Sequence, residues 1–461
     1  MLERPIRKAD TLNTLVPYDM DMVDTELKKA MASSDKKIIV LDDDPTGVQT
    51  VHDIYVYTDW SLESIRQGFA DERPMFFILT NSRGLTGEET RSIHEKIAQN
   101  ICQVSRETER DFIIISRSDS TLRGHYPAET DTLRDSIETF TGEAIDGEII
   151  MPFFPEGGRL TIGDVHYVAD GDTLVPAADT EFASDKTFGY TRSHLGEWIE
   201  EKTQGRYKKE DVVYIGLTEL RALDYAGIRR KLDAVTHFNK IVVNAVEYAD
   251  VKVFVTALAG VMDHKHFMFR TAAGLPKVIG QVSDNPLLTR AELIDARNKN
   301  GGFIIIGSHV QKTTEQLMRL KELDYINFIE FNCFLVVEEA ALQREMERVI
   351  GLANESIRAG KTVAVYTRRD RFDLGGADKE DALRLSVKIS EAVTAIASSL
   401  TNRPNFIIAK GGITSSEVGT KALGVKKALV MGQILHGIPV WLTGPESRFP
   451  NMPYVIFPGN V

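Results

Sequence analysis

The chain has 461 residues, of which 43% are hydrophobic and 26% charged, a composition typical of globular proteins with buried cores. Its net charge of −12 argues against nucleic acid as the main partner, because neutralising a phosphate backbone requires a basic face. Length alone predicts two or three domains.

The cysteines and the hydrophobic runs indicate the compartment. Cys102 and Cys333 lie far apart in apolar surroundings, which favours buried thiols over a disulfide or a zinc site. The N-terminal residues contain no apolar stretch of signal-peptide length, and no later run approaches the length of a membrane helix. We therefore expect a cytoplasmic protein without a membrane partner.

Apolar runs typical of buried strands alternate with helical stretches through the first half of the chain. Between the strands, 86–108 and 127–140 carry apolar residues at helical spacing. This alternation predicts a mostly parallel sheet covered by helices on both faces. Strands are expected at 37–43, 53–58, 75–81, 111–117, 147–153, 211–217, 241–246 and 268–275.

Two segments of this half depart from the alternation. Residues 154–190 are rich in Gly, Asp and Pro, and we expect them to form a hairpin and loop excursion beside the sheet. The first 35 residues are expected to form an extra helix packed on the body, with no chemistry that the sequence reveals.

The second half repeats the same logic after a boundary near 285–300, where proline, charges and paired glycines occur. The sequence therefore predicts an α/β protein with two domains, at 36–290 and 300–461, each a mostly parallel sheet flanked by helices. Strands are expected at 302–308, 327–332, 362–368, 405–412, 427–433 and 439–444, and helices at 311–323, 337–359 and 380–400.

Several first-half strands end in dense clusters of polar residues. One cluster alone is explained as well by a capped turn as by ligand binding. Four in succession favour a site, because ligands of open α/β sheets bind where strand carboxyl ends meet the following loops. The clusters are Asp42–Gly47, Thr80–Arg83, Ser116–Arg123 and Phe154–Arg159.

The residue types in these clusters suit a sugar acid. Arg83, Arg123 and Arg159 could bind a carboxylate through paired hydrogen bonds. The aspartates could accept hydrogen bonds from hydroxyl groups, and one of them could act as a general base toward a hydroxyl nucleophile.

Two strand ends of the second half have a different character. The first, Gly307-Ser308, leads through His309 into a predicted helix, and the second is Gly411-Gly412 followed by Thr414. Glycines followed by hydroxyl residues at a helix N-terminus suit a phosphate group, because the backbone can approach closely and the helix dipole favours an anion. Either turn alone reads better as an ordinary cap. Together, and with FPGN at 457–460, they favour nucleotide binding.

These motifs occur in an order that resembles a known family. They are Asp43-Asp44-Pro45-Thr46-Gly47, Asp119-Ser120-Thr121-Leu122-Arg123-Gly124, Pro155-Glu156-Gly157-Gly158-Arg159, Gly307-Ser308 and Lys410-Gly411-Gly412-Ile413-Thr414-Ser415. From about residue 37 to the C-terminus, the sequence resembles the four-carbon acid sugar kinase family.

The resemblance implies a fold and an activity. It makes 36–290 an acid-sugar-binding domain and 300–461 a nucleotide-binding domain, with the active site in the cleft between them. Family members use ATP, with Mg²⁺ bridging its phosphates, to phosphorylate the terminal hydroxyl of threonate, erythronate or 3-oxo-tetronate. Related members act on the branched acid 3-oxo-isoapionate.

The resemblance also implies roles for individual residues. Asp43 is the expected catalytic base, although Asp42 and Asp44 are adjacent alternatives. The expected substrate contacts are Asp44, Arg83, Asp119, Ser120, Thr121, Arg123 and Arg159. The expected nucleotide contacts are Ser308, Gly411, Gly412, Thr414 and Gly459.

The chain departs from the family pattern at two positions that bear on the nucleotide. Ile413 stands where many members have an acidic residue, and Phe457 where many have lysine. The resemblance therefore assigns no metal ligands.

Two alternatives to a four-carbon acid kinase stay open. One is a kinase of another sugar acid, branched or five-carbon, which only the shape of the pocket would distinguish. The other is a non-catalytic regulator that binds a sugar acid or a nucleotide, against which the retained polar motifs argue. The partners are expected to be small molecules, and a homodimer is the common assembly for α/β enzymes of this size.

Overall fold

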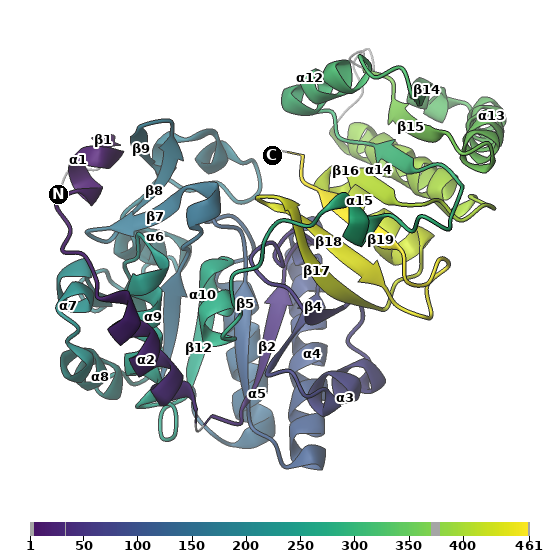
Figure 1. The fold of residues 1–461 in the computed structure, drawn as a ribbon. Coiled ribbons are helices and arrows are strands. Elements are labelled where there is room, and N and C mark those ends of the chain that lie inside the picture. Colours follow the sequence, from purple (N-terminus) through teal and green to yellow (C-terminus); the bar gives the residue numbers. More distant parts are fainter. Residues whose placement is uncertain (1–3, 33, 370–378, 460–461) are drawn as a thin grey trace. The chain divides into compact units, whose positions relative to one another are not determined.

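The computed structural model describes residues 4–32, 34–369 and 379–459, and the chain forms two compact units. Unit 1 comprises Met1–Val51 and Asp59–Asp284, and unit 2 comprises His52–Thr58 and Asn285–Val461. The ribbon is drawn in Figure 1. No helix in the described ranges combines the length and the apolarity needed to cross a membrane.

A parallel sheet forms the centre of unit 1. The strands given below pair in parallel, as expected for strands whose apolar residues are buried on both faces. The order across the sheet is β10 (Val213–Ile215), β11 (Asn239–Val243), β6 (Gly147–Met151), β12 (Phe267–Thr271), β5 (Phe112–Arg117), β2 (Lys37–Asp42) and β4 (Met75–Leu79).

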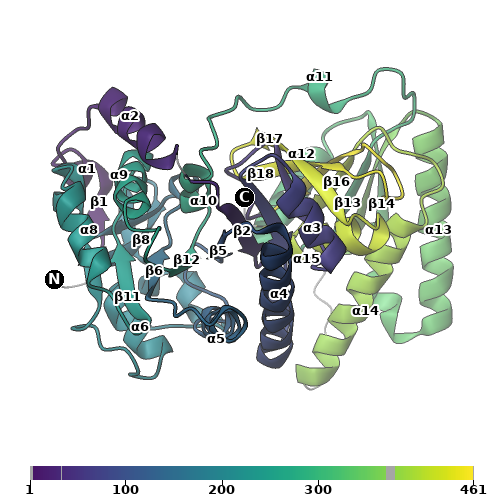
Figure 2. The same ribbon diagram turned by 90° about the horizontal axis from the view of Figure 1, so that it is seen from below.

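Helices cover both faces of this sheet, as the alternating sequence pattern predicts (Figure 2). The longest, α4, begins with a capping box in which Thr86 and Glu89 bond each other's backbone N–H groups. One layer contains α3 (Leu62–Ala70), α4 (Gly87–Thr108) and α5 (Ala128–Thr141). The other contains α2 (Met20–Met31), α7 (Leu217–Arg221), α8 (Tyr225–Asp233), α9 (Tyr248–Ala259) and α10 (Gly274–Ile279).

Within the excursion predicted at 154–190, residues 159–176 form three strands of a small antiparallel sheet. The N-terminal segment, predicted as a helix, contains α1 (Lys8–Leu12) and α2 and also contributes an edge strand to this sheet. The strand order is β1 (Ile6–Arg7), β9 (Thr173–Pro176), β8 (Val165–Asp170) and β7 (Arg159–Ile162).

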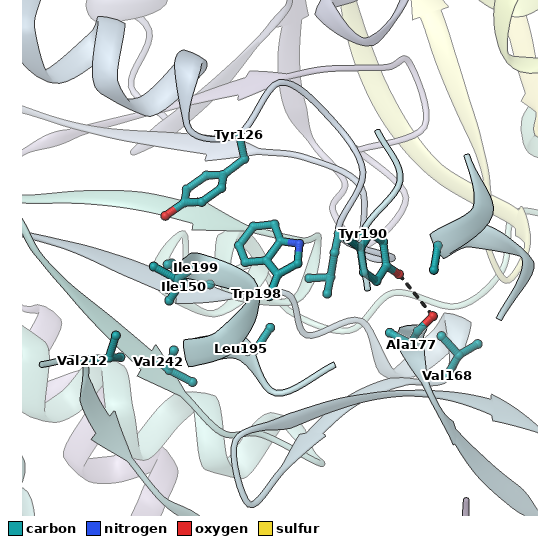
Figure 3. Close-up of a cluster of buried hydrophobic side chains, with 12 residues drawn as sticks. Tyr126, Ile150, Val168, Ala177, Tyr190, Leu195, Trp198, Ile199, Val212 and Val242 are labelled. Atoms are coloured by element: carbon teal, nitrogen blue, oxygen red, sulfur yellow. Dashed lines mark hydrogen bonds between the residues drawn. The ribbon is translucent and has the colours of Figure 1, made fainter. Parts of the chain in front are cut away.

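A buried aromatic cluster joins this excursion to the main sheet (Figure 3). Trp198, on α6 (Leu195–Lys202), is fully buried and stacks on Tyr126 with ring centroids 4.6 Å apart. The Tyr190 hydroxyl donates to the backbone oxygens of Thr121 and Ala177. Because Tyr126 and Thr121 lie at the loop that follows β5, the cluster anchors that loop to the core.

The sheet of unit 2 is mixed. Its parallel part runs in the order β14 (Ile326–Phe331), β15 (Thr362–Thr367), β13 (Phe303–Ile306), β16 (Ile407–Lys410) and β19 (Pro453–Phe457). Antiparallel strands continue it through β18 (Ile438–Thr443), β17 (Lys427–Leu435) and β3 (Ile54–Tyr57).

Helices of unit 2 pack around this sheet. On one face, α12 (Gln311–Leu320) packs its Leu317 against Ile304 and Ile306. The connection from unit 1 contains the short α11 (Arg290–Leu293). The remaining helices are α13 (Glu339–Arg358), which contacts β14 and β15, α14 (Lys379–Ser398) and α15 (Gly412–Glu417).

The segment 53–58 differs from its prediction. The sequence pattern places it as a strand of the first domain, but β3 pairs with β17 of unit 2, where the Asp53 N–H donates to the Val430 carbonyl oxygen at 2.8 Å. An apolar run identifies a strand without identifying its neighbour, which only the tertiary fold selects. Residues 285–290, predicted with the first domain, also lie in unit 2.

Candidate functional site

Three of the four polar clusters of the first half converge because their strands are neighbours. β2 pairs in parallel with β4 on one side and β5 on the other, so the loops after all three strands emerge at the same edge of the sheet. These loops carry the Asp42–Asp44 run, Arg83 and the Asp119–Arg123 segment.

Arg83 is the centre of this convergence. Its Nε and Nη2 donate to the two carboxylate oxygens of Asp43 at 3.1 and 2.6 Å, in the forked geometry that favours arginine over lysine. Its Nη1 lies 2.7 Å from Asp44 Oδ2 and 3.9 Å from Asp119 Oδ1. A single guanidinium thus links three carboxylates from two loops.

Arg117, which the sequence analysis included in a polar cluster without giving it a role, supplies a second guanidinium. It is the last residue of β5, and its side chain is only 3% exposed. Its Nη1 lies 3.1, 3.5 and 3.6 Å from carboxylate oxygens of Asp42, Asp43 and Asp44. An arginine that ends an otherwise apolar, buried strand was the available signal, since a buried cation requires an anionic partner.

Burial and these cations shift the pKa values of the three aspartates in different directions. Burial raises the pKa of Asp42 well above its usual value and raises that of Asp43, and Arg117 and Arg83 oppose the rise only in part. For Asp44, burial acts in the same direction, but Arg83 and Arg117 outweigh it and lower the pKa. Asp44 is also the most exposed of the three, at 21% of its side chain against 1% for Asp42 and 2% for Asp43.

The loop after β5 holds Asp119 through its own side chains. Arg123 Nε donates to Asp119 Oδ2 at 2.7 Å, and the Thr121 hydroxyl donates to the same oxygen. Arg83 and Arg123 lower the pKa of Asp119 despite its burial. Leu122, at φ 68°, and Gly124, at φ 117°, give the loop a backbone that ordinary residues avoid, which is the kind of strain found at ligand sites.

Ser120 and Arg159 occupy the margin of this cluster. The Ser120 carbonyl oxygen accepts from His166 Nε2 at 2.8 Å, which fixes the backbone of the loop. Arg159, at the start of β7, lies over the Phe182 ring that Arg123 also contacts. Among the residues that the structure describes, no carboxylate forms an ion pair with Arg159, so its charge suits an anionic ligand.

Glu129, in the first turn of α5, ties two of the loops together. It is 1% exposed, and its carboxylate accepts from Ser82 Oγ at 2.6 Å and from Ser118 Oγ at 3.3 Å. Ser82 directly precedes Arg83, and Ser118 directly precedes Asp119. The sequence offered no signal for this residue beyond an acidic group near a helix start.

The predicted nucleotide residues lie together in unit 2 for the same topological reason. β16 pairs in parallel with β13 and with β19, so Ser308, Gly411 and Gly459 follow neighbouring strand ends. A Cβ on Gly411, at φ 117°, would lie 2.9 Å from Ser308 Cβ, and a Cβ on Gly307 would lie 2.2 Å from the Thr414 hydroxyl. Only glycine allows turns to approach this closely.

The turns at Gly307–Ser308 and Gly411–Gly412, together with Gly459, are called the cradle below, and hydroxyl groups lie beside them. The Thr313 hydroxyl lies within hydrogen-bond distance of Ser308 Oγ at 3.1 Å and of the Gly459 carbonyl oxygen at 3.3 Å. Gly412 begins α15, where nothing lies within 4 Å of the position its Cβ would take. Of the predicted FPGN segment, Asn460 lies outside the described residues.

Lys410 is a cation of this cradle that the sequence reading left without a role. It is the last residue of β16, pairs across the sheet with Phe457, and donates from Nζ to the Pro458 carbonyl oxygen at 2.5 Å. Burial and the nearby charge of Lys312 lower the pKa of Lys410 to about 8. A bound anion would offset both effects, because it stabilises the protonated amine of Lys410.

The carboxylates of Asp42, Asp43 and Asp44 provide the kind of donor that Mg²⁺ requires. Each has an oxygen within 4.8 Å of the other two, and oxygen-only ligands suit this ion. Arg83 and Arg117 already contact all three, so the cluster is not a free carboxylate cage. Asp44, as the most exposed, is the residue that fits a metal best.

Comparison with known families identifies the chain. A family model described as a sugar-binding N-terminal domain matches residues 38–279, more than half of the chain, and one described as a nucleotide-binding C-terminal domain matches residues 303–461. The chain belongs to the four-carbon acid sugar kinase family. The residues predicted to bind the acid sugar lie within the first match, and the residues predicted to bind the nucleotide lie within the second. No curated protein sequence matches the chain.

Solved structures of two bacterial proteins share the fold. HI1011 of Haemophilus influenzae, a DUF1537 protein, is 17% identical with a TM-score of 0.59, over 92% of this chain and 96% of that one. A Salmonella typhimurium LT2 protein, described as a candidate tRNA synthase, is 16% identical with a TM-score of 0.64 over the same shares. At such identities the likeness shows the two-domain α/β fold alone.

Glu129 generates a prediction that needs no ligand. Glu129→Ala should increase amide hydrogen exchange in 80–85 and 117–124 about tenfold, because the loss of a buried acceptor leaves two hydroxyl groups unsatisfied at a cost of about 1–3 kcal/mol. Hydrogen-exchange mass spectrometry provides the measurement. The exposed Glu95→Ala on α4 is the matched control, and unchanged protection of both loops in Glu129→Ala would contradict the role.

Proposed function

We propose that the chain is an ATP-dependent kinase that phosphorylates the terminal hydroxyl of a four-carbon acid sugar, namely threonate, erythronate or 3-oxo-tetronate. The observation that carries the proposal is the cluster of Asp43, Asp44, Arg83, Asp119 and Arg123 in a family whose domains bind a sugar and a nucleotide. Such a cluster combines fixed cations for a carboxylate with acceptors for hydroxyl groups.

In the proposed mechanism, unit 1 holds the acid sugar. Arg159 and Arg123 bind its carboxylate, and Asp44, Asp119 and Thr121 hydrogen-bond its hydroxyl groups. Asp43 accepts the proton of the terminal hydroxyl, and its raised pKa makes it a better base than an ordinary aspartate. The hydroxyl oxygen forms a bond to the γ-phosphorus of ATP as the bond to the β–γ bridging oxygen breaks, so that ADP leaves.

Unit 2 holds the nucleotide in this proposal. Ser308, Gly411, Gly412, Thr414 and Gly459 surround the phosphates, and Lys410 contributes charge. When bound, Mg²⁺ would neutralise charge on the phosphate oxygens. Phosphoryl transfer requires positioning and charge stabilisation more than covalent participation, and the described side chains offer both.

The catalytic assignment is tested with Asp43→Asn and its neighbour Asp44→Asn. In an ADP-release assay with a panel of tetronates, Asp43→Asn should lower kcat by about 10²–10⁴, because a general base contributes that much. Asp44→Asn should act mainly on KM. Full activity of Asp43→Asn would remove it from the base role.

The same panel separates the alternative functions. Turnover of 3-oxo-isoapionate or of five-carbon acids in preference to tetronates would assign the chain to those substrates. ADP and ATP binding without turnover of any acid would favour a regulator that binds its ligands without chemistry.

The pKa of Lys410 generates a pH prediction. Below about pH 8 its amine is protonated in the free protein, and above that it becomes neutral, so ADP affinity should fall as the pH rises through about 8. Lys410→Met should bind ADP more weakly at pH 7 and lose this alkaline decline. Calorimetric titration of ADP from about 1.5 pH units below to about 1.5 pH units above this pKa measures the affinity of both proteins. A pH profile of the variant identical to that of the wild type would contradict a contact between Lys410 and the nucleotide.

A further inference from the structure

The end of β12 is a strand end of unit 1 to which the proposed mechanism gives no role. β12 lies between β5 and β6, so its carboxyl end emerges between the loop that carries Asp119 and Arg123 and the loop that carries Arg159. The strand reads Phe-Met-Phe up to Arg270, which Thr271 follows, and all five residues are buried. β12 therefore places a guanidinium at the same edge of the sheet as the candidate site.

The backbone that follows this arginine connects the two neighbouring loops. The Ser118 N–H donates to the Thr271 carbonyl oxygen at 2.8 Å, and the Gly274 N–H donates to the Phe153 carbonyl oxygen at 3.1 Å. Ser118 belongs to the loop after β5, and Phe153 lies just after β6. The end of β12 is therefore fixed relative to both loops.

Arg270 is a buried cation with few partners. It is 3% exposed, and its only hydrogen-bond acceptor in the described part of the chain is the Arg123 carbonyl oxygen, 2.9 Å from Nη2. Its Nε is buried without a hydrogen-bond partner, and no carboxylate of that same part forms an ion pair with it. A buried guanidinium that serves packing alone has its N–H groups paired. Arg270 therefore retains a positive charge that the fold does not neutralise.

This charge acts on groups that hold the loop after β5. Burial acts to raise the pKa of Glu129, but His94 and Arg270 act against burial, and the net effect is a lowered pKa. Glu129 therefore stays ionised as an acceptor for the loop. A Cβ on Gly124 would lie 3.5 Å from Arg270 Nη2 and 3.6 Å from Asp43 Oδ2, so the buried cation and the proposed base both approach the same turn.

We propose that Arg270 is a positioning residue for substrate binding: by holding the Arg123 carbonyl oxygen, it directs the Arg123 side chain toward the carboxylate of the acid sugar. The inference rests on the proposed kinase function and adds a residue that does not itself contact the substrate. Arg123 Nε donates to Asp119 at 2.7 Å, so a shift of the Arg123 backbone would displace both side chains. The unneutralised charge of Arg270 also favours an anionic ligand at this loop.

An ordinary structural role fits these observations less well. Arg221 on α7 shows such a role in the same unit, because its side chain is 7% exposed and lies 3.0 Å from an Asp250 carboxylate oxygen and 2.6 Å from one of Glu247. Arg270 has no comparable pair within the described ranges, and its hydrogen bond goes to the loop that carries the proposed substrate contacts.

Steady-state kinetics of Arg270→Met and Arg221→Met test the inference. Arg270→Met should raise the KM for the accepted tetronate about tenfold and leave kcat and the KM for ATP within about twofold, because it removes one hydrogen bond that positions a charged group. Arg270→Lys, which keeps the charge and a donor, should bring the KM to within about threefold of the wild type. Arg221→Met is the matched control, which should lower thermal stability and leave every KM unchanged.

A double-mutant cycle separates positioning from general destabilisation. If Arg270 acts through Arg123, adding Arg270→Met to Arg123→Met should raise the KM for the acid by less than about twofold further. A wild-type KM in folded Arg270→Met, or full additivity of the two changes, would overturn the inference and leave the kinase proposal intact.

Two further measurements cover the remaining outcomes. If Arg270→Met does not fold, Arg270→Gln should give the same rise in KM, because a glutamine amide ends near the position of Nε and does not reach the Arg123 carbonyl oxygen. If the wild type phosphorylates no acid, the kinase proposal fails, and hydrogen exchange still tests the contact. Residues 119–124 should then exchange about tenfold faster in either variant than in the wild type. Unchanged exchange would contradict the positioning role.

Discussion

The arrangement of unit 1 depends on two guanidinium groups that hold three consecutive carboxylates. Asp42, Asp43 and Asp44 lie at the end of a buried strand, where adjacent negative charges would repel one another and lose their hydration. Arg83 and Arg117 reach them from the two neighbouring strands. The parallel order β4–β2–β5 is therefore the constraint from which the geometry of the site follows.

Close packing around these charges keeps them in place. A Cβ on Gly47 would lie 2.0 Å from Asp42 Oδ1, so the turn after the aspartates lies directly on the most buried carboxylate. Glu129 fixes the residues before Arg83 and before Asp119, and His166 fixes the backbone at Ser120. Breaking such a buried ionic network by removing one partner is costly, which makes it a rigid frame for a ligand.

The same network of charges gives the aspartate side chains different pKa values. Burial raises the pKa of Asp42 and Asp43, whereas arginines lower that of Asp44 and Asp119. Carboxylates whose environments differ in this way can serve as base and as anionic ligand side by side. The candidate site of unit 2 contains glycine turns, hydroxyl groups and the amine of Lys410 in place of paired carboxylates and arginines.

Much of this could be predicted from the sequence because strand ends are local features. The polar runs at Asp42, Arg83 and Asp119 were predicted to lie close together, and the parallel topology brings them together. Arg117 and Lys410 were given no role because each is the last residue of a largely apolar strand and reads as part of it. The transfer of β3 to unit 2 and the strand β19 depend on which surfaces pack together, and periodicity does not encode that.

Phosphorylation of a sugar acid is tested most directly by phosphorus NMR of the reaction of the purified chain with ATP, Mg²⁺ and each tetronate. The Asp–Arg cluster predicts, for at least one acid, a new phosphate monoester resonance coupled to the protons of a terminal CH₂ group, and its absence with Asp43→Asn. Spectra that contain only ATP and its hydrolysis products for every acid, or an ester on an internal carbon, would contradict it.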